Sequence, residues 1–93
     1  MEIIIDWEKL ENEEEFYNSF LSQVEAPEWH GHNLDALNDS VVTGQVNGIE
    51  PPYCIKNINS SASRKSIVEF QRKVFSIFTD AAIEPRGIEV IIK

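Results

Sequence analysis

Cysteine, glycine and proline are scarce in this 93-residue chain. The single cysteine, Cys54, cannot form an internal disulfide, which argues against a small exported domain. Four glycines and four prolines beside 42% hydrophobic residues are typical of a globular chain and exclude a disordered tail. No apolar run approaches the ~20 residues that span a bilayer, and the first residues lack the features of a secretory signal. We therefore expect a cytoplasmic protein with one domain over residues 1–93.

Positive charge is also scarce, because sixteen acidic residues stand against eight basic ones and give a net charge of −8. The imbalance is uneven along the chain. Residues 1–39 hold eleven carboxylates and one cation, a net −10, whereas residues 40–93 hold five carboxylates and seven cations, a net +2. Such a chain is repelled by phosphate backbones and attracted to basic surfaces. Acidity also aids solubility, so charge alone does not decide the function.

Hydrophobic spacing predicts six elements in the order strand, helix, helix, strand, helix, strand. Asn12 and Asn33 are expected to cap the first two helices, and the serines of residues 60–63 the third. Strands separated by helices must run parallel, so we expect an α/β domain with a three-stranded parallel sheet covered by helices. The mostly apolar last strand is expected to be covered on both faces. The predicted strands are 3–5, 53–58 and 88–92, and the predicted helices are 13–25, 33–43 and 64–82.

The second predicted helix carries two carboxylates that a purely structural role does not explain. If its apolar positions face the core, the exposed face holds Asp35, Asn38, Asp39 and Val42. Asp35 suits the positive end of the helix dipole, but Asp39 lies one turn later, and two like charges at this spacing cost ~0.2–0.5 kcal/mol. Trp29 and two histidines precede this face, and aromatic area beside charge is common at binding sites.

Each of these residues also has a plainer interpretation. Trp29 can hold its loop against the core, and Gly31 can supply a turn with positive φ. His30 and His32 with Asp35 are a candidate metal group, although the spacing lacks the further ligands of a convincing zinc site. On the residues alone, a binding surface and an ordinary solvated surface are equally open.

The run Pro27-Glu28-Trp29-His30-Gly31-His32-Asn33-Leu34-Asp35-Ala36-Leu37-Asn38-Asp39 resembles the barstar family of ribonuclease inhibitors, and the family's Thr-Gly pair is matched by Thr43-Gly44. The resemblance implies a barstar-like fold with three parallel strands and three helices, with a short fourth helix left open. It implies that Asp39 takes the place of the scissile phosphate in the active site of a ribonuclease, with Asp35 beside it and Trp29 stacked over a catalytic side chain. The implied partner-binding residues are Trp29, His30, Asn33, Asp35, Asn38, Asp39, Thr43, Gly44, Asp80 and Glu84.

Some positions depart from the family pattern. Trp29-His30 replaces an aromatic pair dominated by Tyr, Asn38 stands where the best-known member has Trp, and Gln45 stands where an aromatic is expected. Because interface aromatics carry much of the discrimination between partners, these changes leave the identity of the toxin open. It is either a secreted barnase-like enzyme or the toxic tip of a contact-dependent delivery system.

The sequence thus predicts a bacterial immunity protein that is not an enzyme, needs no cofactor or metal, is monomeric when free and binds its toxin one to one. Two alternatives stay open. One is a regulatory adaptor with the same fold and a non-nuclease partner. The other is a small enzyme that uses His30, His32, Asp35 and Asp39 as acid–base or metal groups. Cys54 is expected in an inert core position.

Overall fold

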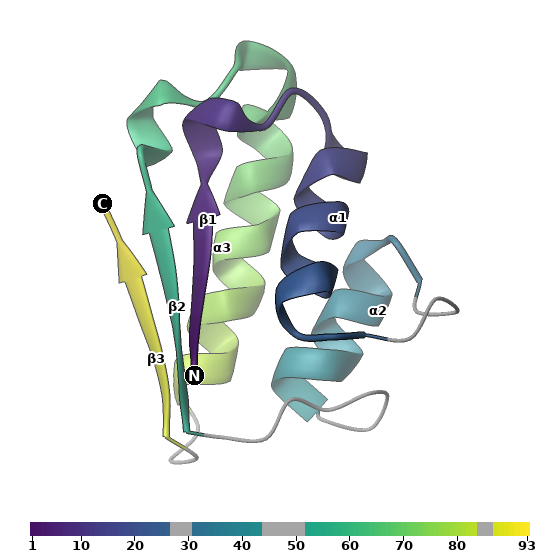
Figure 1. The fold of residues 1–93 in the computed structure, drawn as a ribbon, viewed down its shortest axis with the longest axis vertical. Coiled ribbons are helices and arrows are strands. Elements are labelled where there is room, and N and C mark those ends of the chain that lie inside the picture. Colours follow the sequence, from purple (N-terminus) through teal and green to yellow (C-terminus); the bar gives the residue numbers. More distant parts are fainter. Residues whose placement is uncertain (27–30, 44–51, 84–86) are drawn as a thin grey trace.

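The computed structural model describes residues 1–26, 31–43, 52–83 and 87–93. Three parallel strands form one sheet in the order β1-β2-β3, and helices pack beside it (Figure 1). This confirms the predicted α/β architecture with a three-stranded parallel sheet. The helices and strands are β1 (Glu2–Asp6), α1 (Glu13–Gln23), α2 (Leu34–Asn38), β2 (Tyr53–Ile58), α3 (Val68–Ile83) and β3 (Ile88–Ile92).

The two predicted asparagine caps are confirmed. The Asn12 side chain accepts a hydrogen bond from the backbone N–H of Glu15 at 2.9 Å, and the Asn33 side chain accepts from that of Ala36 at 2.8 Å. Each bond satisfies one of the N–H groups that the first turn of a helix leaves without a partner. Both caps therefore fix where α1 and α2 begin.

The third helix begins later than predicted. Arg64 is extended, a 3-10 turn occupies Lys65–Ile67, and α3 starts only at Val68. The expected serine cap is wrong, because Ser63 instead accepts a hydrogen bond at 2.7 Å from the Gln71 side chain. Residues 59–67, all within the described chain, contain two 3-10 turns and no α-helix, so the short fourth helix is absent.

The helices cover only one face of the sheet (Figure 1). Along β2 the side chains alternate between buried and partly exposed, as expected of a sheet with one covered face. On the other face, Ile4 of β1 keeps 43% of its surface exposed, and on β3 Glu89 is exposed and Ile91 is partly exposed. The expectation that the last strand is covered on both faces is therefore wrong, because the described helices form a single layer.

The core lies between this layer and the sheet, and aromatic rings fill much of it. Trp7 and Phe16 are fully buried and stack with ring centroids 5.5 Å apart, and Phe16 continues the stack onto Phe20 at 5.9 Å. Phe78 of α3 closes the cluster against Phe20. Rings of this size bury large apolar areas, which stabilises a small domain without disulfides.

Candidate partner-binding surface

The second helix changes its geometry at Asp39. It is α-helical over Leu34–Asn38 and continues as a π-helical segment, η2, over Asp39–Thr43. Such turns are rare in proteins and are often found at functional sites. Because a π-turn closes its hydrogen bond one residue later, it changes which side chains share a face. Val41 is fully buried and Val42 packs partly against the core, so the expectation that Val42 lies on the exposed face is wrong.

Four polar residues of the same segment are exposed or partly exposed. Asn33 and Asp35 are exposed, and Asn38 and Asp39 are partly buried, whereas Leu37 between them is fully buried. The structure thus brings four of the predicted partner-binding residues together on one short, capped segment.

Of the remaining predicted partner-binding residues, the structure describes only Thr43 and Asp80. Trp29, His30, Gly44 and Glu84 lie outside the described residues, and Thr43 ends the π-helical segment. Asp80 is exposed on α3, and this helix packs against both α2 and η2. Asp80 thus lies on a helix that is next to α2, and its role in partner binding stays a prediction.

His32 anchors the entrance to α2. Its Nδ1 contacts Oε1 of Glu14, and its ring stacks on Tyr17 with centroids 5.8 Å apart and an interplanar angle of 21°. Both partners lie on α1, so His32 ties the residue before the helix cap to the neighbouring helix. The sequence carried no local signal for this contact, because Glu14 lies 18 positions earlier.

The contacts of His32 also bear on the metal hypothesis. Within the described residues, no group of three or more His, Cys, Asp or Glu side chains is arranged to hold a metal ion. His30 lies outside the described residues. In the described chain His32 therefore acts as a structural contact with α1.

Gly31 lies close to the start of α2. The positive-φ turn expected there stays a prediction, because the residue before Gly31 lies outside the described residues. A Cβ at this position would lie 3.0 Å from Nδ2 of Asn33 and 3.1 Å from Cβ of Ala36. The glycine is needed because the chain passes close to the capped first turn of α2.

Tyr17 holds a buried hydroxyl beside this contact. Its oxygen makes no hydrogen bond within the described chain. Burial, and then the negative charges of Glu13 and Glu14, raise the pKa of Tyr17 to about 12. The phenol is therefore neutral at physiological pH, and its apolar ring supports His32.

The described ion pairs leave the side of α2 negative. Lysine and arginine pair with Asp6, Glu2, Glu11 and Glu69, none of which lies on α2. Asp35 has no cation within ion-pair distance in the described chain, and α1 adds three glutamates in its first turn. A surface with this potential favours a basic partner.

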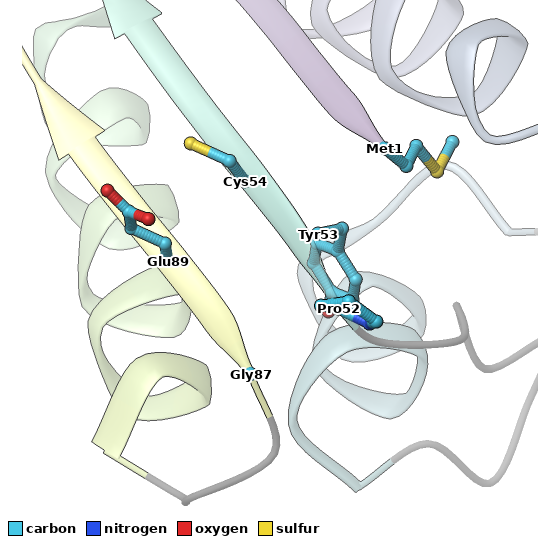
Figure 2. A pocket seen from close by; sticks show the side chains of 6 residues that line it. All are labelled: Met1, Pro52, Tyr53, Cys54, Gly87 and Glu89. Carbon is cyan, nitrogen blue, oxygen red and sulfur yellow. The ribbon is translucent and has the colours of Figure 1, made fainter.

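A separate hollow of about 240 Å³ lies where β2 and β3 begin (Figure 2). Cys54 lies between Glu2 and Glu89 in the register of the sheet, and burial together with these carboxylates raises the pKa of the thiol. The thiol is partly exposed, so its expected core position is wrong, although the raised pKa makes it a poor nucleophile. The hollow is lined by Met1, Pro52, Tyr53, Cys54, Gly87 and Glu89.

Comparison with known proteins identifies the family of the chain. A search of curated proteins finds no match. No helix within the described ranges is long and apolar enough to cross a bilayer. The family model described as "Barstar (barnase inhibitor)" matches residues 1–93, the whole chain. The chain therefore belongs to the Barstar family, a family of inhibitors and not of enzymes.

Proposed function

We propose that this protein is an immunity protein that blocks a cationic ribonuclease toxin in the cytoplasm of the cell that makes the toxin. One inhibitor binds one toxin, with α2 and the loop before it inserted into the active site. The observation that carries the proposal is the capped acidic segment Asn33–Asp39, in a chain that matches the family of barnase inhibitors over its whole length.

Charge and placement together support this mode of binding. A ribonuclease active site is basic because it must hold the phosphate of its substrate. Asp35 and Asp39 lie one turn apart on a short segment whose start is fixed by the Asn33 cap and by the His32 contact with α1. A pre-organised segment loses little conformational entropy on binding, so more of its interaction energy contributes to affinity.

Asp39 is the proposed anchor, because its carboxylate can take the position of the scissile phosphate. Charge-assisted hydrogen bonds to arginine, lysine or histidine are short and strong. Removal of the carboxylate would leave those cations buried and unpaired, which is the main cost of breaking such a contact. Asp35 supports it from the preceding turn.

The other proposed contacts surround this anchor. Trp29 and His30 supply aromatic area from the loop before α2, and Asn33 and Asn38 supply polar side chains from the segment itself. Thr43 and Gly44 contribute backbone and polar contacts where the segment ends. Asp80 and Glu84 form an acidic rim, where charges change the association rate more than the affinity.

The test compares three variants with the wild type in titration calorimetry against the cognate ribonuclease, co-purified from the native operon. Asp39→Ala is expected to weaken binding by about 3–5 kcal/mol. Its melting temperature is measured alongside, so that a loss of affinity is not confused with a loss of folding. Asp35→Ala should weaken binding less.

Glu8→Gln is the matched control, because it also removes one negative charge but lies far from α2, in the turn Trp7–Lys9 (Figure 1). It should leave the affinity within about twofold of the wild type, since a distant exposed charge is screened by salt. An unaltered affinity of Asp39→Ala would refute the proposed anchor, and an equal loss in Glu8→Gln would show that net charge alone drives binding.

A further inference from the structure

The two outer edges of the sheet differ. At the β1 edge, the side-chain amide of Gln23 pairs with the backbone of Ile4, because Nε2 donates to the carbonyl at 2.7 Å and Oε1 accepts from the N–H at 2.8 Å. A side chain from α1 thus occupies the place that a further strand would take at the middle of β1. Natural proteins protect sheet edges in this way against pairing with other chains.

The β3 edge has no such cover. The backbone groups of Glu89 and Ile91 face β2, as the register and the flanking bonds from Tyr53 N to Gly87 O and from Lys93 N to Asn57 O require. The N–H and C=O groups of the alternate residues point outward, and within the described chain they make no hydrogen bond. None of the described helices lies beyond this edge (Figure 1). The outward-facing residues are Ile88, Val90 and Ile92.

We propose that this edge binds the β3 edge of a second copy of the chain, which gives a dimer with a continuous six-stranded sheet. A two-fold axis between identical edge strands makes them antiparallel. With the axis at Val90, Val90 faces Val90 of the second copy, and Ile88 faces Ile92 of the second copy. All of these residues have outward-facing backbone groups, so each facing pair can exchange both hydrogen bonds of an antiparallel ladder.

The side chains of β3 fit the same register. The pair of Ile88 with Ile92 of the second copy would cover the exposed surface of Ile92. On the other face, Glu89 lies opposite Ile91 of the second copy. One of its two diagonal neighbours is Lys93 of the second copy, within reach of its long side chain, and the other is Glu89 of the second copy. The strand therefore meets its own copy with apolar pairs on the face of Val90 and with one pair of opposite charges at each end of the other face.

The charge distribution permits this contact despite the net charge. The acidic excess lies in residues 1–39, whereas residues 40–93 carry a net +2 from seven cations and five carboxylates. β3 and α2 lie on opposite sides of the molecule (Figure 1). Dimerisation would therefore leave both acidic segments exposed, and each copy could still bind one toxin. In this proposal the free protein is in a weak monomer–dimer equilibrium, in contrast to the monomer that the sequence predicts.

Sedimentation velocity and amide hydrogen exchange on the full chain, from about 10 µM to about 1 mM, test this. The expected dissociation constant is on the order of 0.1 mM, because one strand edge buries little area. The N–H groups of Ile88, Val90 and Ile92 should gain protection as concentration rises, whereas those of Glu89 and Ile91 should be protected throughout. A monomer at the highest concentration, or protection without this alternation, would overturn the proposal.

Two variants of β3 and one control variant of β1 test the proposed contact directly. Val90→Pro removes an outward-facing N–H and no hydrogen bond to β2, so the dissociation constant should rise at least about tenfold. Ile92→Lys should do the same, while Ile4→Lys on β1, where the wild-type side chain is similarly exposed, should leave the dimer intact. Dimerisation of Val90→Pro or Ile92→Lys that is as strong as that of the wild type contradicts the proposal. Protection of the β3 edge that appears only when the ribonuclease is added also contradicts it, because the edge would then bind a strand of the toxin.

The contact between Glu89 and Lys93 of the second copy is tested by exchanging the two charges. Glu89→Lys places like charges on the diagonals and should weaken the dimer, and the double variant Glu89→Lys with Lys93→Glu should restore it. Failure of the double variant to restore association would overturn the proposed register. None of these substitutions lies in the proposed toxin-binding segment, so toxin affinity reports on the two proposals separately.

Discussion

The indole Nε1 of Trp7 donates a hydrogen bond at 2.9 Å to Oδ1 of Asn57, and both side chains are fully buried. The same asparagine donates from Nδ2 to the carbonyl of Ile91 at 3.2 Å. One side chain on β2 therefore joins the turn after β1 to strand β3. Buried polar groups that are fully paired in this way fix one arrangement of the surrounding elements.

Replacement of this asparagine should destabilise the fold. Asn57→Leu keeps a similar volume but leaves the Trp7 N–H buried without a partner, which costs about 1–3 kcal/mol. Urea unfolding should show this loss in the free energy of unfolding. Trp7→Phe should also destabilise, and the double variant should lose less than the sum, because the two groups share one hydrogen bond. Additive losses would show that the bond contributes nothing specific.

The contact between Trp7 and Asn57 also shows where sequence reasoning ends. Alternation and capping are local properties, so the strands and the Asn12 and Asn33 caps could be predicted. The partner of Trp7 lies 50 positions away, and no pattern within a window of residues indicates it. Long-range contacts of this kind depend on the assembled fold.

In the candidate site, too, local patterns could be predicted from the sequence and features of the assembled fold could not. The acidic residues Asp35 and Asp39 could be found from helical spacing and from the family motif. The π-turn could not, because i→i+5 and i→i+4 bonds use the same residue types, and the inward position of Val42 depends on it. The cover of only one face of the sheet could not be predicted either, because a mostly apolar strand has the same sequence pattern whether one or both of its faces are covered.

The raised pKa of Tyr17 predicts that the folded protein loses stability at high pH. The raised pKa, about 12 against an ordinary value near 10, means that the folded chain keeps a proton that the unfolded chain releases. The stability that this group contributes is therefore present below pH of about 10 and is lost as the pH rises toward about 12. Tyr17→Phe should remove this part of the pH dependence.

At neutral pH the same variant should be as stable as the wild type or more stable by about 1 kcal/mol, because it removes a buried hydroxyl that makes no hydrogen bond in the described chain. Chemical unfolding at a series of pH values gives both results. Cys54 also has a raised pKa, so the difference between the two proteins, and not the slope of either, isolates Tyr17. A clear loss of stability at neutral pH would contradict the burial argument.

The cover of the β1 edge by Gln23 is expected to affect both the stability of the fold and its tendency to aggregate. Gln23→Ala removes two hydrogen bonds to the backbone of Ile4 and should cost about 1–2 kcal/mol. It also exposes the middle of the β1 edge, so light scattering during long incubation should show faster association. Ser22→Ala, at the exposed neighbouring position on α1, is the control and should change neither quantity. Equal association of the two variants would show that the β1 edge needs no cover.

His32 provides the last prediction, which rests on the proposed function. His32→Ala removes both the Glu14 contact and the ring stacked on Tyr17, so the residues before α2 lose their attachment to α1. Binding of the ribonuclease should weaken about tenfold, because the segment must then be ordered during association. Tyr17→Phe keeps the stacked ring and should bind as tightly as the wild type, which makes it the matched control in the same calorimetric titration. If His32→Ala binds with unchanged affinity while Asp39→Ala does not, the acidic anchor stands and the role of α1 in positioning it is refuted.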